Sequence, residues 1–97
     1  MKEVELITNH KPEFLKYLKS KFPLYHMSNI FFRDIHFGVL SYLQSQGKKV
    51  GYVEAEMIVR QVAAEYEKDG VFKKIDHQSW LLNYPEYMLP RVEKKAS

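Results

Sequence analysis

Apolar residues recur at helical spacing near the start of the chain. Four of them fall on one side of a helix with 3.6 residues per turn, while lysines lie toward another side: Phe14, Leu15, Leu18 and Phe22. Pro12 suits a first helical turn, and Pro23 marks an end. The pattern predicts a helix between these two prolines with one buried face.

The strongest helical pattern is the stretch LYHMSNIFFRDIHFGVLSYLQSQG. Its apolar stripe, widened by Phe31, consists of Phe32, Ile35, Val39, Tyr42 and Leu43. Ser28 is the expected N-cap, with Met27 packing on Phe32, and Gly47 lies just past the expected end. Because glycine is costly inside a helix, Gly38 predicts a close backbone contact or a slight bend.

A third helix is predicted over residues 52–68. Glu54 and Glu56 lie near its positive N-terminal end, and Gly70 follows as a C-terminal stop. The residues expected on its buried face are Ala55, Ile58, Val59, Val62 and Tyr66.

Strand patterns occupy both ends of the chain. The stretches VFKKI and SWLLNY predict a hairpin joined by a four-residue loop over residues 76–79. This register pairs Ile75 with Trp80, Lys73 with Leu82 and Val71 with Tyr84, and it predicts that Trp80 is buried against the long central helix. Near the N-terminus, Val4 and Leu6 alternate with glutamates, which favours a short half-buried strand.

Together these elements predict an α+β domain with three helices and a small C-terminal β-hairpin, to which a short N-terminal strand could add. A helix, a glycine, a strand, a polar turn and a second strand follow one another in EKDGVFKKIDHQSWLLNY. Over residues 28–84 this order resembles the architecture of winged-helix domains, which implies a hairpin wing beside a last helix. Such domains usually place a short helix and a turn before that last helix, and residues 52–68 have room for one helix only. Residues 1–90 are expected to form one domain, with residues 91–97 as a flexible basic tail.

The charge of the chain is unevenly distributed. The 97 residues carry a formal net charge of +3, which suits an anionic partner. Residues 52–70 are the exception, because Arg60 and Lys68 stand against Glu54, Glu56, Glu65, Glu67 and Asp69. An acidic helix is repelled by the phosphates that flank the major groove of DNA.

Several classes of function lack their sequence signals. The chain has no cysteine, which excludes disulfides and thiolate chemistry and fits a cytoplasmic location. Its four histidines fall in separate elements and form no metal-binding spacing. No nucleophile–base pair, catalytic carboxylate pair or phosphate-binding glycine loop occurs, and no apolar run is long enough to cross a membrane. We therefore expect no enzymatic activity, no cofactor, no metal and no membrane partner.

Two sets of residues remain as candidate binding sites. The first is the apolar run in NYPEYMLP, which is expected to be extended and to dock either on the chain itself or on a partner: Tyr84, Tyr87, Met88 and Leu89. The second comprises the lysines that could contact a nucleic-acid backbone without reading sequence: Lys48, Lys49, Lys73 and Lys74.

The sequence favours a non-enzymatic binding module whose partner is another protein or a second copy of the chain. The alternative is a winged-helix-like protein that binds nucleic acid weakly and with little specificity. The acidic third helix favours the first hypothesis.

Overall fold

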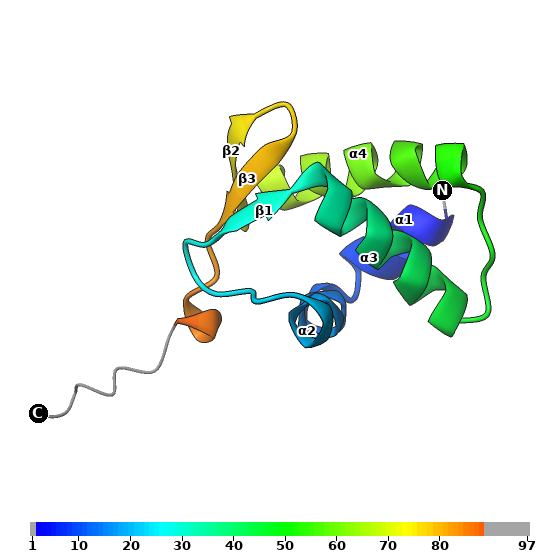
Figure 1. The fold of residues 1–97 in the computed structure, drawn as a ribbon, viewed down its shortest axis with the longest axis horizontal. Helices are drawn as coiled ribbons and strands as arrows, with labels where there is room; N and C mark the ends of the chain where they lie inside the picture. The colour runs from blue at the N-terminus through cyan, green and yellow to red at the C-terminus, as the bar shows by residue number, and fades with distance from the viewer. Residues whose placement is uncertain (1, 89–97) are drawn as a thin grey trace, which may run out of the picture.

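The computed structural model describes residues 2–88, and within them it contains four α-helices and a three-stranded antiparallel sheet (Figure 1). In chain order the elements are α1 (Lys2–Thr8), α2 (Lys11–Lys21), β1 (Asn29–Phe31), α3 (Phe32–Ser45), α4 (Tyr52–Lys68), β2 (Phe72–Asp76), β3 (Ser79–Leu82) and a short 3-10 helix at Pro85–Tyr87. The α+β class is as predicted, with one helix more than expected.

The sheet has the strand order β1-β3-β2, so β1 pairs with the last strand of the hairpin. From α2 onward the elements follow the order helix, strand, helix, helix and hairpin, which is winged-helix-like (Figure 1). In this arrangement α3 is the helix that precedes α4, and the hairpin β2–β3 is in the position of the wing. Winged-helix domains usually place another helix before the last one, and residues 52–68 form only one helix. In this chain α3 occupies the position of that earlier helix.

The predicted N-terminal strand is wrong, because residues 2–8 form α1. Val4 and Ile7, three residues apart, are both buried on one side of this helix. Glu3 and Glu5 lie in the first turn, where the helix dipole favours negative charge. The alternation at Val4 and Leu6 was too short to distinguish a strand from one face of a short helix.

The predicted N-cap at Ser28 is also wrong. Helix α3 begins at Phe32, and Ser28 belongs to a turn in which its Oγ accepts a hydrogen bond from the Tyr25 amide at 3.1 Å. Met27 has a φ of 68°, is half exposed and lies four residues before Phe31, the N-cap of α3, so it does not occupy the position of a hydrophobic staple. The three residues before α3 form β1 because their backbone pairs with β3.

The hairpin forms, but its register differs from the predicted one. Lys73 lies opposite Leu81 and Lys74 lies opposite Trp80, and an irregularity between Lys74 and Asp76 leaves Ile75 unpaired. The Asp76 carboxylate accepts hydrogen bonds from the Gln78 amide at 2.8 Å and the Ser79 hydroxyl at 2.9 Å. These two bonds hold the pKa of Asp76 below its ordinary value and close a tighter turn than the four-residue loop we predicted.

The core brings together most of the predicted apolar faces. All five residues predicted on the inner side of α4 are buried, as are Phe14, Leu15 and Leu18 of α2, whereas Phe22 is partly buried. In the predicted α3 stripe Ile35, Val39, Tyr42 and Leu43 are buried and Phe32 is partly buried. Phe31, which was expected to widen this stripe, is 51% exposed and belongs to β1. Trp80 is 1% exposed, which confirms its predicted burial. Its indole Nε1 donates to Glu67 of α4 at 2.7 Å, so the helix that anchors the indole is α4 and not the long central helix that we predicted.

Gly38 of α3 lies directly against the side chain of Leu18 of α2. A Cβ atom at this position would overlap Cδ2 of Leu18, which is the close contact that the sequence predicted. The side chain of Leu18 is buried and has little room to move.

We expect Gly38→Ala to lower the free energy of unfolding by about 1 kcal/mol. A helical alanine gains up to about 1 kcal/mol over glycine, but overpacking a core costs roughly 1–3 kcal/mol. Urea denaturation measures the net loss. In the Leu18→Ala background the overlap is gone, so Gly38→Ala should become neutral or stabilising. Equal destabilisation in both backgrounds would show that Leu18 is not the cause.

Candidate functional site

The outward side of α4 carries large apolar side chains exposed to solvent. Tyr52 is 71% exposed, Val53 70% and Met57 53%. Val53 and Met57 are four residues apart and so lie on one side of the helix, with the exposed Glu54 and Glu56 beside them. We refer to these five residues as the α4 face. It combines apolar contact area with negative charge.

Most other charged groups of α4 are engaged by the fold. Arg60 Nη1 donates to the His77 carbonyl in the hairpin turn at 2.6 Å, and its guanidinium lies 4.3 Å from the centre of the Phe32 ring. Lys68 forms an ion pair with Glu65 at 3.8 Å. Among residues 2–88, Glu54 and Glu56 form no ion pair. The charge that the α4 face presents is therefore negative.

The start of α4 is held by His36, which lies on the buried side of α3. The His36 Nε2–H donates to the Tyr52 carbonyl at 3.0 Å, and the two rings meet edge to face with their centres 4.3 Å apart. This contact ties the first turn of α4 to α3. It fixes the position of the α4 face through Tyr52, whose side chain nevertheless stays largely exposed.

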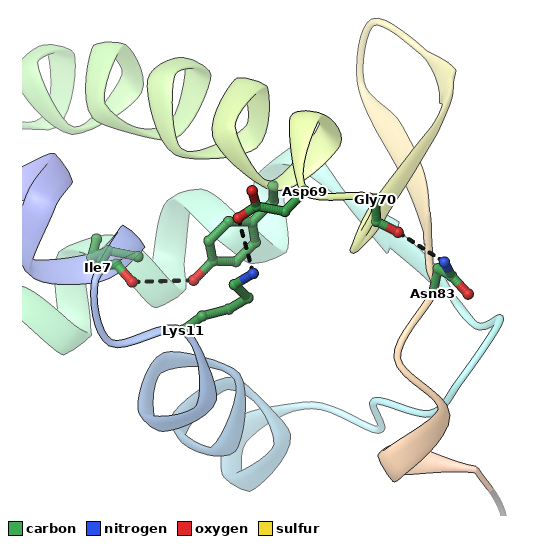
Figure 2. Close-up of polar contacts among 6 residues, drawn as sticks. Ile7, Lys11, Asp69, Gly70 and Asn83 are labelled. Carbon is green, nitrogen blue, oxygen red and sulfur yellow. Dashed lines mark hydrogen bonds and ion pairs between the residues drawn. The ribbon is translucent and has the colours of Figure 1, made fainter.

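The other end of α4 is held by contacts to three different elements (Figure 2). Lys11 of α2 pairs with Asp69 at 2.9 Å, and Asn83 donates to the Gly70 carbonyl at 2.8 Å. The Tyr66 hydroxyl donates to the Ile7 carbonyl of α1 at 3.3 Å. Because both ends of the helix are fixed, the α4 face is a preorganised surface.

The four lysines of the nucleic-acid hypothesis do not form one patch. Lys48 and Lys49 lie in the loop before α4, and Lys73 and Lys74 lie on β2 after it. The 17 residues of α4 separate the two pairs, and at 1.5 Å per residue they span roughly 25 Å. Figure 1 shows the loop and the hairpin at opposite ends of this helix.

The C-terminal segment packs on its own chain. Tyr84 and Tyr87 are partly buried against the core with their ring centres 5.0 Å apart. The Tyr84 amide donates to His26 Nδ1 at 3.0 Å, and the His26 amide donates to the Tyr87 carbonyl at 2.9 Å. Lys19 of α2 lies 5.1 Å from the centre of the Tyr87 ring.

The path of this segment differs from the predicted one. Residues 85–87 form a 3-10 helix where an extended path was expected, because a proline also suits the first position of a helical turn. Met88 is half exposed, whereas Leu89 lies outside the described residues. The two tyrosines contribute to the fold of the domain and do not join the α4 face.

A second apolar surface lies where the end of α2, the strand β1 and the first turns of α3 meet. It is a groove of about 380 Å³ lined by Phe22, Phe31, Arg33, Asp34 and Phe37. The rings of Phe22 and Phe37 meet edge to face with their centres 6.0 Å apart, and Phe31 and Phe37 are half exposed. We refer to these five residues as the aromatic groove.

Neither surface was predicted from the sequence, because both contain apolar residues that do not fit a buried stripe. Val53, Met57 and Phe37 lie off the buried stripes of their helices, and that misfit is the signal that could have identified them.

The described part of the chain shows no arrangement typical of a metal centre. Within residues 2–88 no three histidine, aspartate or glutamate side chains gather closely enough to hold an ion. In the same range, no helix combines the length and the apolar character that crossing a bilayer requires. Neither observation identifies a partner.

Comparison with protein-family models, with curated proteins and with solved structures finds no match to this chain. The two surfaces described above therefore carry the functional argument.

Proposed function

We propose that this domain is a non-enzymatic protein-binding module that binds its partner through the α4 face. The observation that carries the proposal is the exposure of Tyr52, Val53 and Met57 on the outward side of a helix fixed at both ends. Apolar side chains gathered on one rigid element are typical of interaction surfaces. We also propose a cytoplasmic location, on the basis of the absence of cysteine.

Nucleic-acid binding is the weaker alternative. In a winged-helix-like domain, α4 is the helix placed to enter a major groove, and there Glu54 and Glu56 would approach phosphates. Arg60, the residue of α4 best suited to read a base edge, is bound to the hairpin turn and to Phe32. The separated lysine pairs favour, at most, weak contacts with a nucleic-acid backbone.

The proposal is tested by capturing partners with the full chain and identifying them by mass spectrometry. A variant that carries both Val53→Glu and Met57→Glu should fail to capture a protein that the wild type captures. Ile75→Glu is the matched control, because Ile75 is also apolar and 52% exposed but lies on β2. Retention of the same proteins by the α4 variant, or equal losses in both variants, would contradict the proposal.

A second prediction concerns duplex DNA. Any binding by the wild type should be weak and lost at moderate salt, and Glu54→Lys with Glu56→Lys should strengthen it by removing repulsion of the phosphates. Retention on immobilised DNA across a salt gradient measures both effects. Tight, sequence-selective binding by the wild type near physiological salt would place the nucleic-acid alternative first.

A further inference from the structure

The α4 face and the aromatic groove are complementary in chemistry. The α4 face presents Val53 and Met57 beside two exposed carboxylates, and the groove presents three aromatic rings beside the exposed Arg33. Asp34 also lines the groove, but it lies in the first turn of α3, where the positive end of the helix dipole offsets about half of its charge. A thioether such as that of Met57 packs favourably against aromatic ring edges.

We propose that the aromatic groove of one copy receives the α4 face of a second copy. This inference rests on the proposed function, since it names the partner of the same α4 face. Met57 and Val53 enter the groove. Glu54 and Glu56 flank these two residues on opposite edges, so one of the two carboxylates lies toward Arg33 of the receiving chain and the other lies at the opposite rim. Opposite charges at the rim guide and orient the encounter.

Charge favours this contact over a symmetric one between two α4 faces. A symmetric contact would bring the carboxylates of Glu54 and Glu56 from both copies together. The nearest cation on the helix, Arg60, is already bound to the His77 carbonyl and to Phe32. The groove supplies Arg33, for which no ion pair is present among the described residues.

The two surfaces lie on different parts of the domain. Helix α3 packs against α4 and against α2 (Figure 1). The aromatic groove is lined by residues of α3, of β1 and of the chain just after α2, and by no residue of α4. The contact is therefore head to tail, and each copy keeps one unused surface after the first contact. Because few side chains take part, the interface is smaller than the roughly 1,200–2,000 Å² of stable complexes, and association is concentration-dependent.

The test combines two variants, each of which removes one surface. Met57→Glu removes the α4 face, and Phe37→Glu removes the groove. Both positions are about half exposed, so both variants should stay folded, and a lower thermal midpoint is expected only for Phe37→Glu, which also loses the ring contact with Phe22. Sedimentation velocity of the full chain over about a hundredfold range of concentration measures the mass. We expect the wild-type mass to rise beyond that of a dimer, whereas each variant alone stays at the monomer mass.

Mixing the two variants gives the sharpest result. The intact groove of the Met57→Glu chain can receive the intact α4 face of the Phe37→Glu chain, so an equimolar mixture should reach twice the monomer mass and stop there. Arg33→Glu should weaken association of the wild type, and combining it with Glu54→Lys and Glu56→Lys in one chain should restore it. A wild type that stays monomeric, variants that associate like the wild type, or a mixture that stays monomeric while the wild type associates would each overturn the inference.

Failure of this inference differs from failure of the proposed function. If the wild type is monomeric but the α4 variant with glutamate at positions 53 and 57 releases a captured protein, the α4 face binds a different chain and only the second-copy inference fails. If that variant has the same mass in solution as the wild type and captures the same proteins, both the second-copy inference and the proposed function fail.

Discussion

Replacing Trp80 by alanine should lower the free energy of unfolding by about 3–5 kcal/mol, the range for a large aromatic side chain removed from a core. Trp80 lies on the central strand β3, opposite Ile30 of β1 and Lys74 of β2. Its ring centre is 5.7 Å from that of Phe72, and its indole donates to Glu67. The substitution leaves a cavity between the sheet and α4. Urea denaturation of the two proteins measures the loss.

Two controls separate packing from the hydrogen bond of the indole. Trp80→Phe keeps an aromatic ring but removes the donor, so its loss should be clearly smaller than that of Trp80→Ala. Glu67→Gln keeps an acceptor at the partner position, so its effect should be about 1 kcal/mol or less. The fluorescence of native Trp80 should be blue-shifted and protected from quenchers. A loss below about 1 kcal/mol for Trp80→Ala, or readily quenched native fluorescence, would contradict the packing described for the hairpin.

Tyr66 is the second position where a large effect is expected. Its buried ring meets Phe14 of α2 at 6.4 Å and Phe72 of β2 at 5.0 Å between ring centres, and its hydroxyl donates to the Ile7 carbonyl. It therefore joins α1, α2 and β2 to α4. Tyr66→Ala should cost about 3–5 kcal/mol of unfolding free energy, and Tyr66→Phe about 0.5–1.5 kcal/mol, as measured by urea denaturation. If Tyr66→Ala and Tyr66→Phe lowered the free energy of unfolding by similar amounts, the packing of the Tyr66 ring described here would be contradicted.

The phenol of Tyr66 also predicts a dependence of stability on pH. Burial is the main cause that raises the pKa of Tyr66 far above its ordinary value of 10.0. Above the ordinary pKa of tyrosine the unfolded chain releases the Tyr66 proton, whereas the folded chain keeps it. The free energy of unfolding therefore falls as the pH rises above this ordinary pKa toward the raised pKa of the folded chain. Thermal midpoints should therefore fall less steeply for Tyr66→Phe than for the wild type above the ordinary pKa. Equal slopes would contradict the prediction.

The sequence predicted the helices with long apolar stripes and missed the short elements. The inner faces of α3 and α4 follow from periodicity, because many residues repeat the same spacing. Helix α1 is too short to show a helical period in its sequence. Strand β1 has only three residues and lies within an apolar run, and it forms a strand only because it pairs with β3, which is distant in the sequence. The hairpin register failed because the hydrogen bonds of Asp76 tighten the turn and leave Ile75 unpaired.

The candidate site was harder to predict than the fold. Tyr84 and Tyr87 were expected to dock either on the chain itself or on a partner, and the structure places them against the core near His26. Val53 and Met57 lie outside the predicted inner face of α4, so their exposure could have been inferred from the same periodicity. The aromatic groove depends on three elements that meet only in the folded chain.

The most direct test of the α4 face is a photo-crosslink. Benzoylphenylalanine is placed at Val53 in the full chain, and the same residue placed at Ile75 is the control, because both side chains are exposed. After irradiation of cells that produce the protein, we predict an adduct with another polypeptide, either a second copy or a different protein, from position 53 and little from position 75. The absence of an adduct from position 53, or equal adducts from both positions, would contradict the assignment of α4 as the protein-binding surface.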